Sequence, residues 1–342
     1  MDTNFEKTLK QLSDALSMDK CIALAQALPE ETLLKIIERD NISNTVLVAI
    51  VKTGNSKIIS KLLKKDNLEQ YLQEAIAECA DFDLLFSLIE KINNSEHCSP
   101  FALNTVQKRI IKTQNNEMFK KLLDIEKLEL SSFAQEFFAK TGNPEFITKL
   151  FKQPILCMDA QAAILETGNE HFISELLKRR DLAWWLQKNI AETGNKEFIT
   201  KLLEREKLVE NAQVTIAQTS DDTFISKLLE RKDLHWATQY NIVKSKNPEF
   251  ILKVLDGPIL DRVVEMTIVK LGNKEAISKL LDAEHLDGDT QLAIVEHHSN
   301  DKELLIKLLK RSDITRNTLD IIAKYLRVDF RQILIKKLTE TN

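Results

Sequence analysis

Several residue types are scarce in this 342-residue chain, and each scarcity excludes a class of protein. Only 7 glycines and 6 prolines occur, which excludes collagen-like and low-complexity chains and favours helices joined by short turns. No apolar run approaches the roughly 18 residues that a membrane-spanning helix needs. The first residues also lack the basic and apolar segments of a secretory signal. The sequence therefore predicts a largely helical protein without a membrane span.

The cysteines and the net charge point to no particular catalytic or binding chemistry. The four cysteines, Cys21, Cys79, Cys98 and Cys157, follow no CxxC spacing, which favours a reduced cytoplasmic protein with buried thiols. The 48 basic and 52 acidic residues give a formal net charge of -4. Such a balance provides no overall attraction to nucleic acid or anionic lipid.

One feature that the chain has in abundance is self-similarity. The stretch "ETGNKEFITKLL" at 192–203 returns as "KTGNPEFITKLF", "ETGNEHFISELL" and "QTSDDTFISKLL". We number each repeat from the Thr of this turn, taken as position 0. The repeats then begin at Ala27, Thr53, Cys79, Thr113, Thr141, Thr167, Thr193, Thr219, Ser245, Leu271, Ser299 and Tyr325. Most are 26 or 28 residues long, so the chain reads as an array of about twelve repeats.

Each repeat has the pattern of two helices. Positions 5, 6, 9 and 10 are almost always apolar, which places one broad stripe on a first helix. A second helix runs from about a Leu at position 15 to an Ile at position 23. Neither helix buries its stripe alone, so neighbouring repeats must stack. We predict an all-α fold, a right-handed α-solenoid of about twelve two-helix repeats of 26–28 residues.

The predicted boundaries follow from where the pattern weakens. We expect N-terminal capping helices over 1–26, a repeat array over 27–324 with an insertion loop at 93–100, and a C-terminal capping helix over 325–342. Insertions in such arrays often lie on the binding face. The loop is therefore a candidate contact through His97 and Cys98, although a tolerated surface loop explains it as well.

The glycine turn between repeats has two interpretations, a phosphate cradle or a helix boundary. Glycine at position 1 suits the left-handed residue that ends a helix. Asn or Asp fills position 2 in ten of the twelve repeats, and both are preferred N-cap residues. No GxxxxGK[ST] string occurs. We therefore predict that the turn ends one helix and begins the next.

A lysine at position 8 of nine repeats could form a basic row for a polyanion, and nucleic-acid binding is the alternative function. In seven of these repeats a glutamate stands four residues earlier, as in Glu197 and Lys201 or Glu249 and Lys253. That orientation stabilises a helix by roughly 0.2–0.5 kcal/mol per pair. We therefore predict intrahelical ion pairs on a solvated face, and nucleic acid is the less favoured partner.

Tryptophan gives the best candidate site. Trp184 and Trp236 share position 17 in repeats two apart, where other repeats carry Gln70, Glu210, Arg262 or Gly288. The pattern predicts exposed rings, which with Trp185 and His235 would form an aromatic patch. Tryptophan is enriched at interface hot spots. The alternative is that each ring packs over a neighbouring helix as part of the core.

Sites for metal or catalysis find little support. His285 and His298 stand at opposite ends of one second helix, separated by roughly 15 Å at 1.5 Å per residue. No HExxH, zinc-finger or GxSxG spacing occurs. A base and a nucleophile adjacent in a loop, as His97 and Cys98 are, rarely hold a productive geometry. We therefore expect no catalytic residue, no metal and no cofactor.

The repeat "TGNKEFITKLLEREKLVENAQVTIAQ" resembles the short HEAT-like repeats of bacterial proteins. It is similar to the leucine-rich-repeat-variant family and to related uncharacterised bacterial families. The chain lacks the cysteine cluster and proline-rich units of the variant family, so the resemblance implies no iron–sulfur centre. It implies a non-enzymatic scaffold that binds a protein or extended peptide, with one helix of each repeat lining a concave surface.

One enzymatic family is also built of HEAT-like helices. The alkylpurine DNA glycosylases place Trp and Asp around a damaged base. Four residues after each tryptophan this chain has no acid, but Lys188, Asn189 and Tyr240. This departure and the acidic pI of about 6.0 argue against a DNA enzyme.

Overall fold

The computed structural model describes residues 3–15, 17–39, 41–65, 67–94, 98–257 and 260–325. These residues form 24 α-helices and no strand, so the all-α prediction is confirmed. The described helices include none that is long and apolar enough to cross a membrane. The chain divides into two compact units, residues 1–175 and 176–342, with the boundary inside one helix. The predicted C-terminal cap lies outside the described residues, apart from Tyr325.

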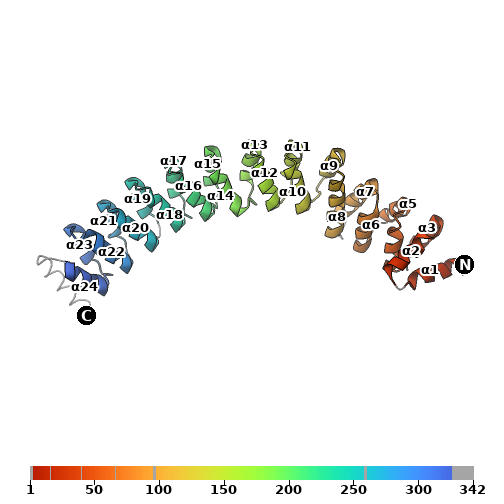
Figure 1. Cartoon of the computed structure of the whole chain (residues 1–342), viewed down its shortest axis with the longest axis horizontal. Helices are drawn as coiled ribbons and strands as arrows, with labels where there is room; N and C mark the ends of the chain where they lie inside the picture. The colour runs from red at the N-terminus through yellow and green to blue at the C-terminus, as the bar shows by residue number, and fades with distance from the viewer. Residues whose placement is uncertain are drawn as a thin grey trace. The chain divides into compact units, whose positions relative to one another are not determined.

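The N-terminal unit consists of helix pairs that follow one another along the chain. Its helices are α1 (Thr3–Ser13), α2 (Met18–Gln26), α3 (Glu30–Ile37), α4 (Asn44–Val51), α5 (Ser56–Leu63), α6 (Gln70–Cys79), α7 (Phe82–Asn93), α8 (Pro100–Lys112), α9 (Asn116–Leu123), α10 (Ser132–Lys140), α11 (Pro144–Leu150) and α12 (Met158–Glu166). From α2 to α12 each even-numbered helix packs on the next even-numbered helix. Odd-numbered neighbours such as α3 and α5 form a second layer (Figure 1).

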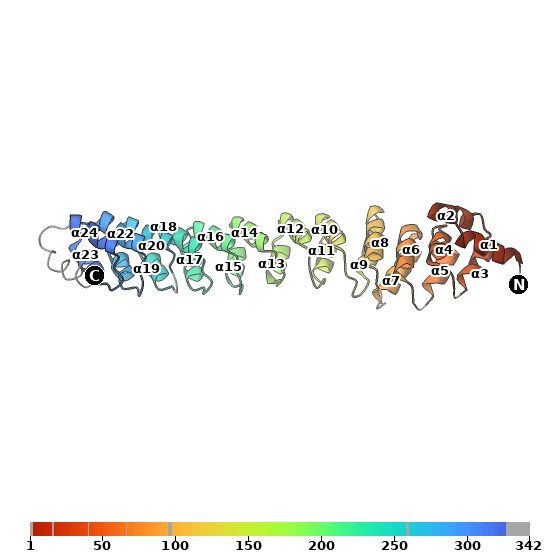
Figure 2. The ribbon, with the colours of Figure 1, turned by 90° about the horizontal axis from the view of Figure 1, so that it is seen from below.

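The C-terminal unit repeats this arrangement more regularly. It begins within α13 (Glu170–Lys178) and continues through α14 (Trp184–Glu192), α15 (Lys196–Leu203), α16 (Glu210–Gln218), α17 (Asp222–Leu229), α18 (Trp236–Lys244), α19 (Pro248–Leu255), α20 (Arg262–Leu271), α21 (Lys274–Leu280), α22 (Gly288–His298), α23 (Lys302–Leu309) and α24 (Arg316–Tyr325). Two layers result, one of even-numbered and one of odd-numbered helices, as Figure 2 shows from a second direction. The even-numbered helices pack together more extensively than the odd-numbered ones.

The turns between helices have the predicted local chemistry. The five glycines at position 1 of their repeats all have φ between 64° and 76°, the left-handed region in which glycine is unstrained. The Asn or Asp that follows accepts hydrogen bonds from the first turn of the next helix. Asn195, for example, accepts from the backbone N–H of Glu197 at 3.0 Å and of Phe198 at 3.2 Å. The turn is a helix boundary, as the sequence predicts.

The apolar stripes meet in the space between the two layers. Phe198, Ile199, Leu202 and Leu203 of α15 are all buried. Ile190 and Ile216, near the ends of the even-numbered helices α14 and α16, are fully buried. Each pair of helices in the C-terminal unit thus contributes side chains to a shared core. Burying apolar surface there contributes about 25 cal/mol per Å² to stability.

A row of buried glutamines lies along the even-numbered helices, and the sequence pattern alone did not predict it. Eight glutamines occupy the equivalent position of the even-numbered helices: Gln73, Gln107, Gln135, Gln161, Gln187, Gln213, Gln239 and Gln291. Six of them accept a hydrogen bond from a backbone N–H of the next repeat, whereas the Oε1 of Gln239 accepts no such bond. Gln213 shows the arrangement in full. Its Nε2 donates to the carbonyls of Leu208 at 2.9 Å and Asp233 at 3.0 Å, and its Oε1 accepts from the backbone N–H of His235 at 3.0 Å. One amide thereby satisfies main-chain groups of two successive repeats.

Glu265 takes the glutamine's place in α20. Its carboxylate is buried and accepts a hydrogen bond from the hydroxyl of Thr290 at 2.8 Å. Burial raises the pKa of Glu265, and the hydrogen bond from Thr290 opposes this only in part. An ionised carboxylate cannot donate to the carbonyls that a glutamine amide would satisfy at this position. This junction is therefore the one in which a titratable group replaces a neutral amide.

Candidate binding surface on the even-numbered helices

Exposed apolar side chains of the described residues gather at one edge of the even-numbered layer. Eight large hydrophobic residues are exposed, and all except Leu24 lie within three residues of the start of an even-numbered helix. In the N-terminal unit these are Phe101, Phe133, Ile155 and Met158; in the C-terminal unit they are Trp184, Trp236 and Val263. Exposed apolar groups scattered singly need no explanation, but their concentration near the starts of even-numbered helices favours an interaction surface in each unit.

The tryptophans stand where the sequence predicts. Trp184 is the first residue of α14 and 62% exposed, and Trp236 is the first residue of α18 and 45% exposed. Trp185 is half-buried beside Trp184. The predicted exposure of Trp184 and Trp236 is thus confirmed, whereas only Trp185 fits the alternative of a ring packed against its neighbours. The binding role of all three stays a prediction.

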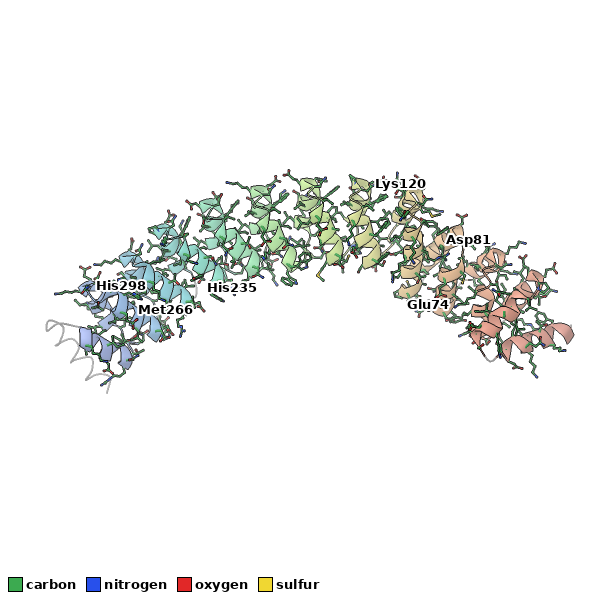
Figure 3. The ribbon with its side chains drawn as sticks, viewed as in Figure 1. Glu74, Asp81, Lys120, His235, Met266 and His298 are labelled. Carbon is green, nitrogen blue, oxygen red and sulfur yellow. The ribbon has the colours of Figure 1, made fainter. Side chains whose placement is uncertain are left out.

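His235 links the second tryptophan to the helix between the two. It is the N-cap of α18, with Nδ1 accepting from the backbone N–H of Ala237 at 3.3 Å. Its ring lies 5.5 Å from that of Trp236, and its Nε2 is 3.2 Å from a carboxylate oxygen of Glu210, the first residue of α16. Figure 3 shows His235 on the side of the even-numbered helices, together with Met266. These contacts of His235 therefore hold the first turn of α18, where Trp236 lies, against the start of α16.

Behind this edge the even-numbered layer of the C-terminal unit presents an uncharged strip. One row holds Val214, Tyr240, Met266 and Leu292, all half-buried, on α16, α18, α20 and α22. The adjacent row holds Thr215, Asn241 and Thr267. Interface centres are depleted of charge and enriched in aromatic residues and Met. The strip and the tryptophan edge together have that composition.

The odd-numbered layer differs because its lysines are paired. The predicted intrahelical pairs form for Lys201 with Glu197 at 2.6 Å and for Lys253 with Glu249 at 2.8 Å. The prediction is wrong for three further lysines, which reach the acid at the end of the preceding odd-numbered helix instead. These pairs are Lys149 with Asp124, Lys279 with Asp256 and Lys307 with Asp282. Repeats stack closely enough for that acid to be as near as the one in the same helix. With the pair of Lys61 and Glu38, six of the nine lysines in this row have a carboxylate partner.

The remaining sequence candidates do not assemble into a reactive site. Cys98 is half-buried, and burial raises the pKa of its thiol, which disfavours the thiolate that nucleophilic chemistry requires. His97 lies outside the described residues. Within the described ranges no three His, Cys, Asp or Glu side chains converge on a point that could hold a metal ion. His298 instead contacts the carbonyl of Val269 at 2.9 Å through Nε2.

Sequence reasoning missed a contact between repeats made by an arginine at position 12 and an aspartate at position 14. We call it a clamp: the arginine bonds carbonyls of the preceding repeat and the aspartate holds the arginine. Arg231 donates through Nη1 to the carbonyls of Leu203 at 2.8 Å and Arg205 at 2.9 Å, in the preceding repeat. Its Nε and Nη2 both donate to Asp233 at 2.8 Å. Arg311 with Asp313 reproduces the arrangement on α21 and α23. The signal was visible as a recurrent R-x-D, but its partners are carbonyls that no sequence pattern marks.

Neither a comparison with protein-family models nor one with curated proteins finds a match for this chain. Its function is therefore inferred from the fold and from this surface.

Proposed function

We propose that this chain is a non-catalytic, HEAT-like α-solenoid of right-handed type that binds a protein or extended peptide along its even-numbered helices. The proposal includes a cytoplasmic location and a multi-point contact in which Trp184 and Trp236 are anchors. The observation that carries it is the exposure of two tryptophans at the same position of α14 and α18, the even-numbered helices on either side of α16. Exposed tryptophan is uncommon on surfaces that only face water.

Two further observations support a polypeptide partner. The uncharged strip of Val214, Tyr240 and Met266 lies on α16, α18 and α20, and the exposed Lys188 takes the equivalent position on α14. Interface centres are likewise uncharged and surrounded by a polar rim. Six of the nine lysines at position 8 that could attract a polyanion are engaged by carboxylates: Lys61, Lys149, Lys201, Lys253, Lys279 and Lys307. The C-terminal unit thus presents an amphipathic face rather than a basic one.

Replacement of both tryptophans by alanine tests the proposal. Partners would be captured from a native cell lysate on immobilised wild-type chain and identified by mass spectrometry, and their affinities then measured with purified components. We expect Trp184→Ala with Trp236→Ala to weaken binding of a genuine partner by tenfold or more, because hot-spot residues contribute about 2 kcal/mol or more. The free energy of unfolding should change by less than about 1 kcal/mol, since both rings are exposed.

The matched control is Arg262→Ala, which changes the equivalent exposed position of α20, where the side chain pairs with Asp289 and not with His235 or a tryptophan. It should leave affinity within about threefold of wild type. Equal partner affinity in the double tryptophan variant would rule out this surface. A partner whose affinity falls steeply between 50 and 200 mM salt would point to a phosphate-tracking mode instead.

A further inference from the structure

One clamp of the C-terminal unit lacks its aspartate. Arg205 stands at position 12, equivalent to Arg231 and Arg311, but two residues later the chain has Lys207 in place of an aspartate. Arg205 still reaches back to the preceding repeat, donating to the carbonyls of Leu177 and Arg179. Its Nε is buried without a hydrogen-bond partner. A buried guanidinium N–H without an acceptor is uncommon, since removal of one partner leaves the full desolvation penalty.

The missing carboxylate has a second consequence. In the complete clamps the aspartate also accepts from a backbone N–H of the preceding repeat: Asp313 accepts from Leu286 at 2.9 Å, and Asp233 from Leu208. The equivalent N–H beside Lys207 is that of Leu182. A lysine ammonium has donors only and cannot accept this bond. In the complete clamps the arginine Nε–H and this backbone N–H both donate to the aspartate carboxylate. At Lys207 that carboxylate is missing for the Arg205 Nε–H and the Leu182 N–H.

The electrostatics of the position favour an anion. A cleft of about 720 Å³ lies between the loops at 177–180 and 204–207. Six of its lining residues are basic and two, Glu204 and Glu206, are acidic; the basic residues are Lys178, Arg179, Arg180, Lys201, Arg205 and Lys207. The next cleft along the unit, between 203–206 and 227–233, has four of each. A third cleft, between 226–232 and 253–257, has three basic and two acidic residues, so the basic excess is largest at the clamp without aspartate.

The rim of the position is exposed, and a ligand that reaches the covered Arg205 Nε must displace the groups around it. The aspartates of the complete clamps remain partly accessible, with Asp233 42% exposed on its side chain. Lys207 is exposed, and Arg180 is exposed on the loop that leads into α14 and its first residue, Trp184. Burial lowers the pKa of Arg205, which the nearby carboxylate of Asp181 opposes. Asp181 itself is held by Arg179 through two hydrogen bonds of 2.8 Å.

We propose that this cleft binds a side-chain carboxylate of an acidic peptide, with the Arg205 Nε–H and the Leu182 N–H as donors and Lys207 as the charge partner. The ligand carboxylate takes the place that Asp233 and Asp313 take in their own clamps. The inference rests on the proposed function and specifies it: a bound polypeptide has an acidic residue next to the segment that covers Trp184. Arginine suits this role because its planar fork binds carboxylates with two parallel hydrogen bonds.

A fluorescein-labelled hexaglutamate peptide is the probe, with binding followed by fluorescence anisotropy at 50 and 150 mM salt. Lys207→Asp places a carboxylate where the ligand should bind, so hexaglutamate affinity should fall about tenfold or more. The same variant completes the clamp and should raise the melting temperature of the free chain. Unchanged affinity in Lys207→Asp would overturn the proposal.

Two controls separate this site from general charge attraction. Lys232→Asp makes the same charge change beside a complete clamp and should alter affinity by less than about threefold, as expected of an exposed charge. Asp233→Lys turns that clamp into a copy of the Arg205 arrangement and should raise the number of hexaglutamate sites from one to two. Equal weakening by Lys232→Asp would show that only net charge matters and would overturn the site.

Two further measurements distinguish an acidic peptide from RNA as the ligand, and the carboxylate site from the proposed function. A fifteen-nucleotide poly-uridine RNA that binds more tightly than hexaglutamate and is lost in Lys207→Asp would overturn the peptide assignment. Hexaglutamate binding that survives Trp184→Ala with Trp236→Ala, while no polypeptide partner depends on the tryptophans, would leave the carboxylate site intact and refute the proposed function. Loss of tryptophan-dependent binding and of hexaglutamate binding can thus be told apart.

Discussion

The two units build similar helix pairs but join them through different side chains at position 12. In the C-terminal unit Arg231 and Arg311 clamp the carbonyls of the preceding repeat. In the N-terminal unit Lys65 donates to Ile37 at 2.9 Å and Gln153 to Leu128 at 3.0 Å. The acceptors are carbonyls at or after the end of the preceding odd-numbered helix. These junctions share a long donor whose charge differs from repeat to repeat, but Gly257 and Ala283 occupy position 12 in two other repeats, so the donor is not required at every junction.

The largest expected effect tests whether the units are separate folding blocks. Phe138 is fully buried in the N-terminal unit, with ring centroids 5.5 Å from those of Phe119, Phe137 and Phe146. Phe138→Ala should cost about 3–5 kcal/mol. Native-state hydrogen exchange should show lost protection confined to residues 1–175. Equal loss across 176–342 would mean that the two units unfold as one, and Phe133→Ala, at a 42% exposed residue, is the mild control.

A smaller effect is expected from breaking a clamp. Arg231→Met removes the donors to two carbonyls and leaves the Asp233 carboxylate unpaired, so the free energy of unfolding should fall by about 2–4 kcal/mol. Gln153→Met breaks the neutral counterpart in the N-terminal unit and should cost about 1–2 kcal/mol. Chemical denaturation measures both. Lys232→Met, at an exposed residue, should change stability by less than about 0.5 kcal/mol. If Gln153→Met lowers the free energy of unfolding as much as Arg231→Met does, charged and neutral donors contribute equally and the distinction is wrong.

The glutamine row allows a pH-dependent comparison. Because burial raises the pKa of Glu265, the folded chain holds this proton more tightly than the unfolded chain. The stabilisation is complete below the ordinary glutamate value of 4.5 and is lost as pH rises through the raised pKa. Glu265→Gln should therefore match wild type in acid and exceed it by about 1–3 kcal/mol at neutral pH.

Thermal unfolding from pH 4 to 8 measures this difference. The groups that face Glu265 are the hydroxyl of Thr290, the carboxylate of Asp287 and the imidazole of His285. The reciprocal change, Gln161→Glu, should give the N-terminal unit the same loss of stability with rising pH. A pH-independent gain in Glu265→Gln would show that the buried carboxylate does not titrate in this range.

The smallest expected effect concerns the turn. At position 1 of the repeat, Gly194 has φ of 69°, whereas Ser220 has φ of 56° with a Cβ present. Left-handed backbone costs a non-glycine residue roughly 1–2 kcal/mol, and glycine's extra chain entropy offsets about 0.5–1 kcal/mol of this. Ser220→Gly should therefore raise stability by up to about 1 kcal/mol, and Gln114→Gly should do the same in the N-terminal unit. A lower melting temperature in both would contradict the strain.

Sequence reasoning succeeded where the determinants are local. The caps such as Asn195, the left-handed glycines and the exposed Trp184 all follow from residue type and position within one repeat. It failed for contacts between repeats, whose partners are 20 to 30 residues apart. Lys149 selects Asp124 over the glutamate of its own helix, and Gln213 bonds main-chain atoms that every residue possesses. Such contacts depend on how closely repeats stack, which is a property of the packed array.

The glutamine row has a consequence for how such a chain changes over generations. Gln213 and Gln291 contact the next repeat mainly through its peptide groups, with the hydroxyl of Thr238 as an additional donor to Gln213, so these junctions depend little on the side chains beyond them. A 26-residue segment can therefore be duplicated, deleted or exchanged with its joining chemistry preserved, because stability sums over neighbours. The outer residues are then free to diversify one repeat at a time, as Lys207 does beside Asp233.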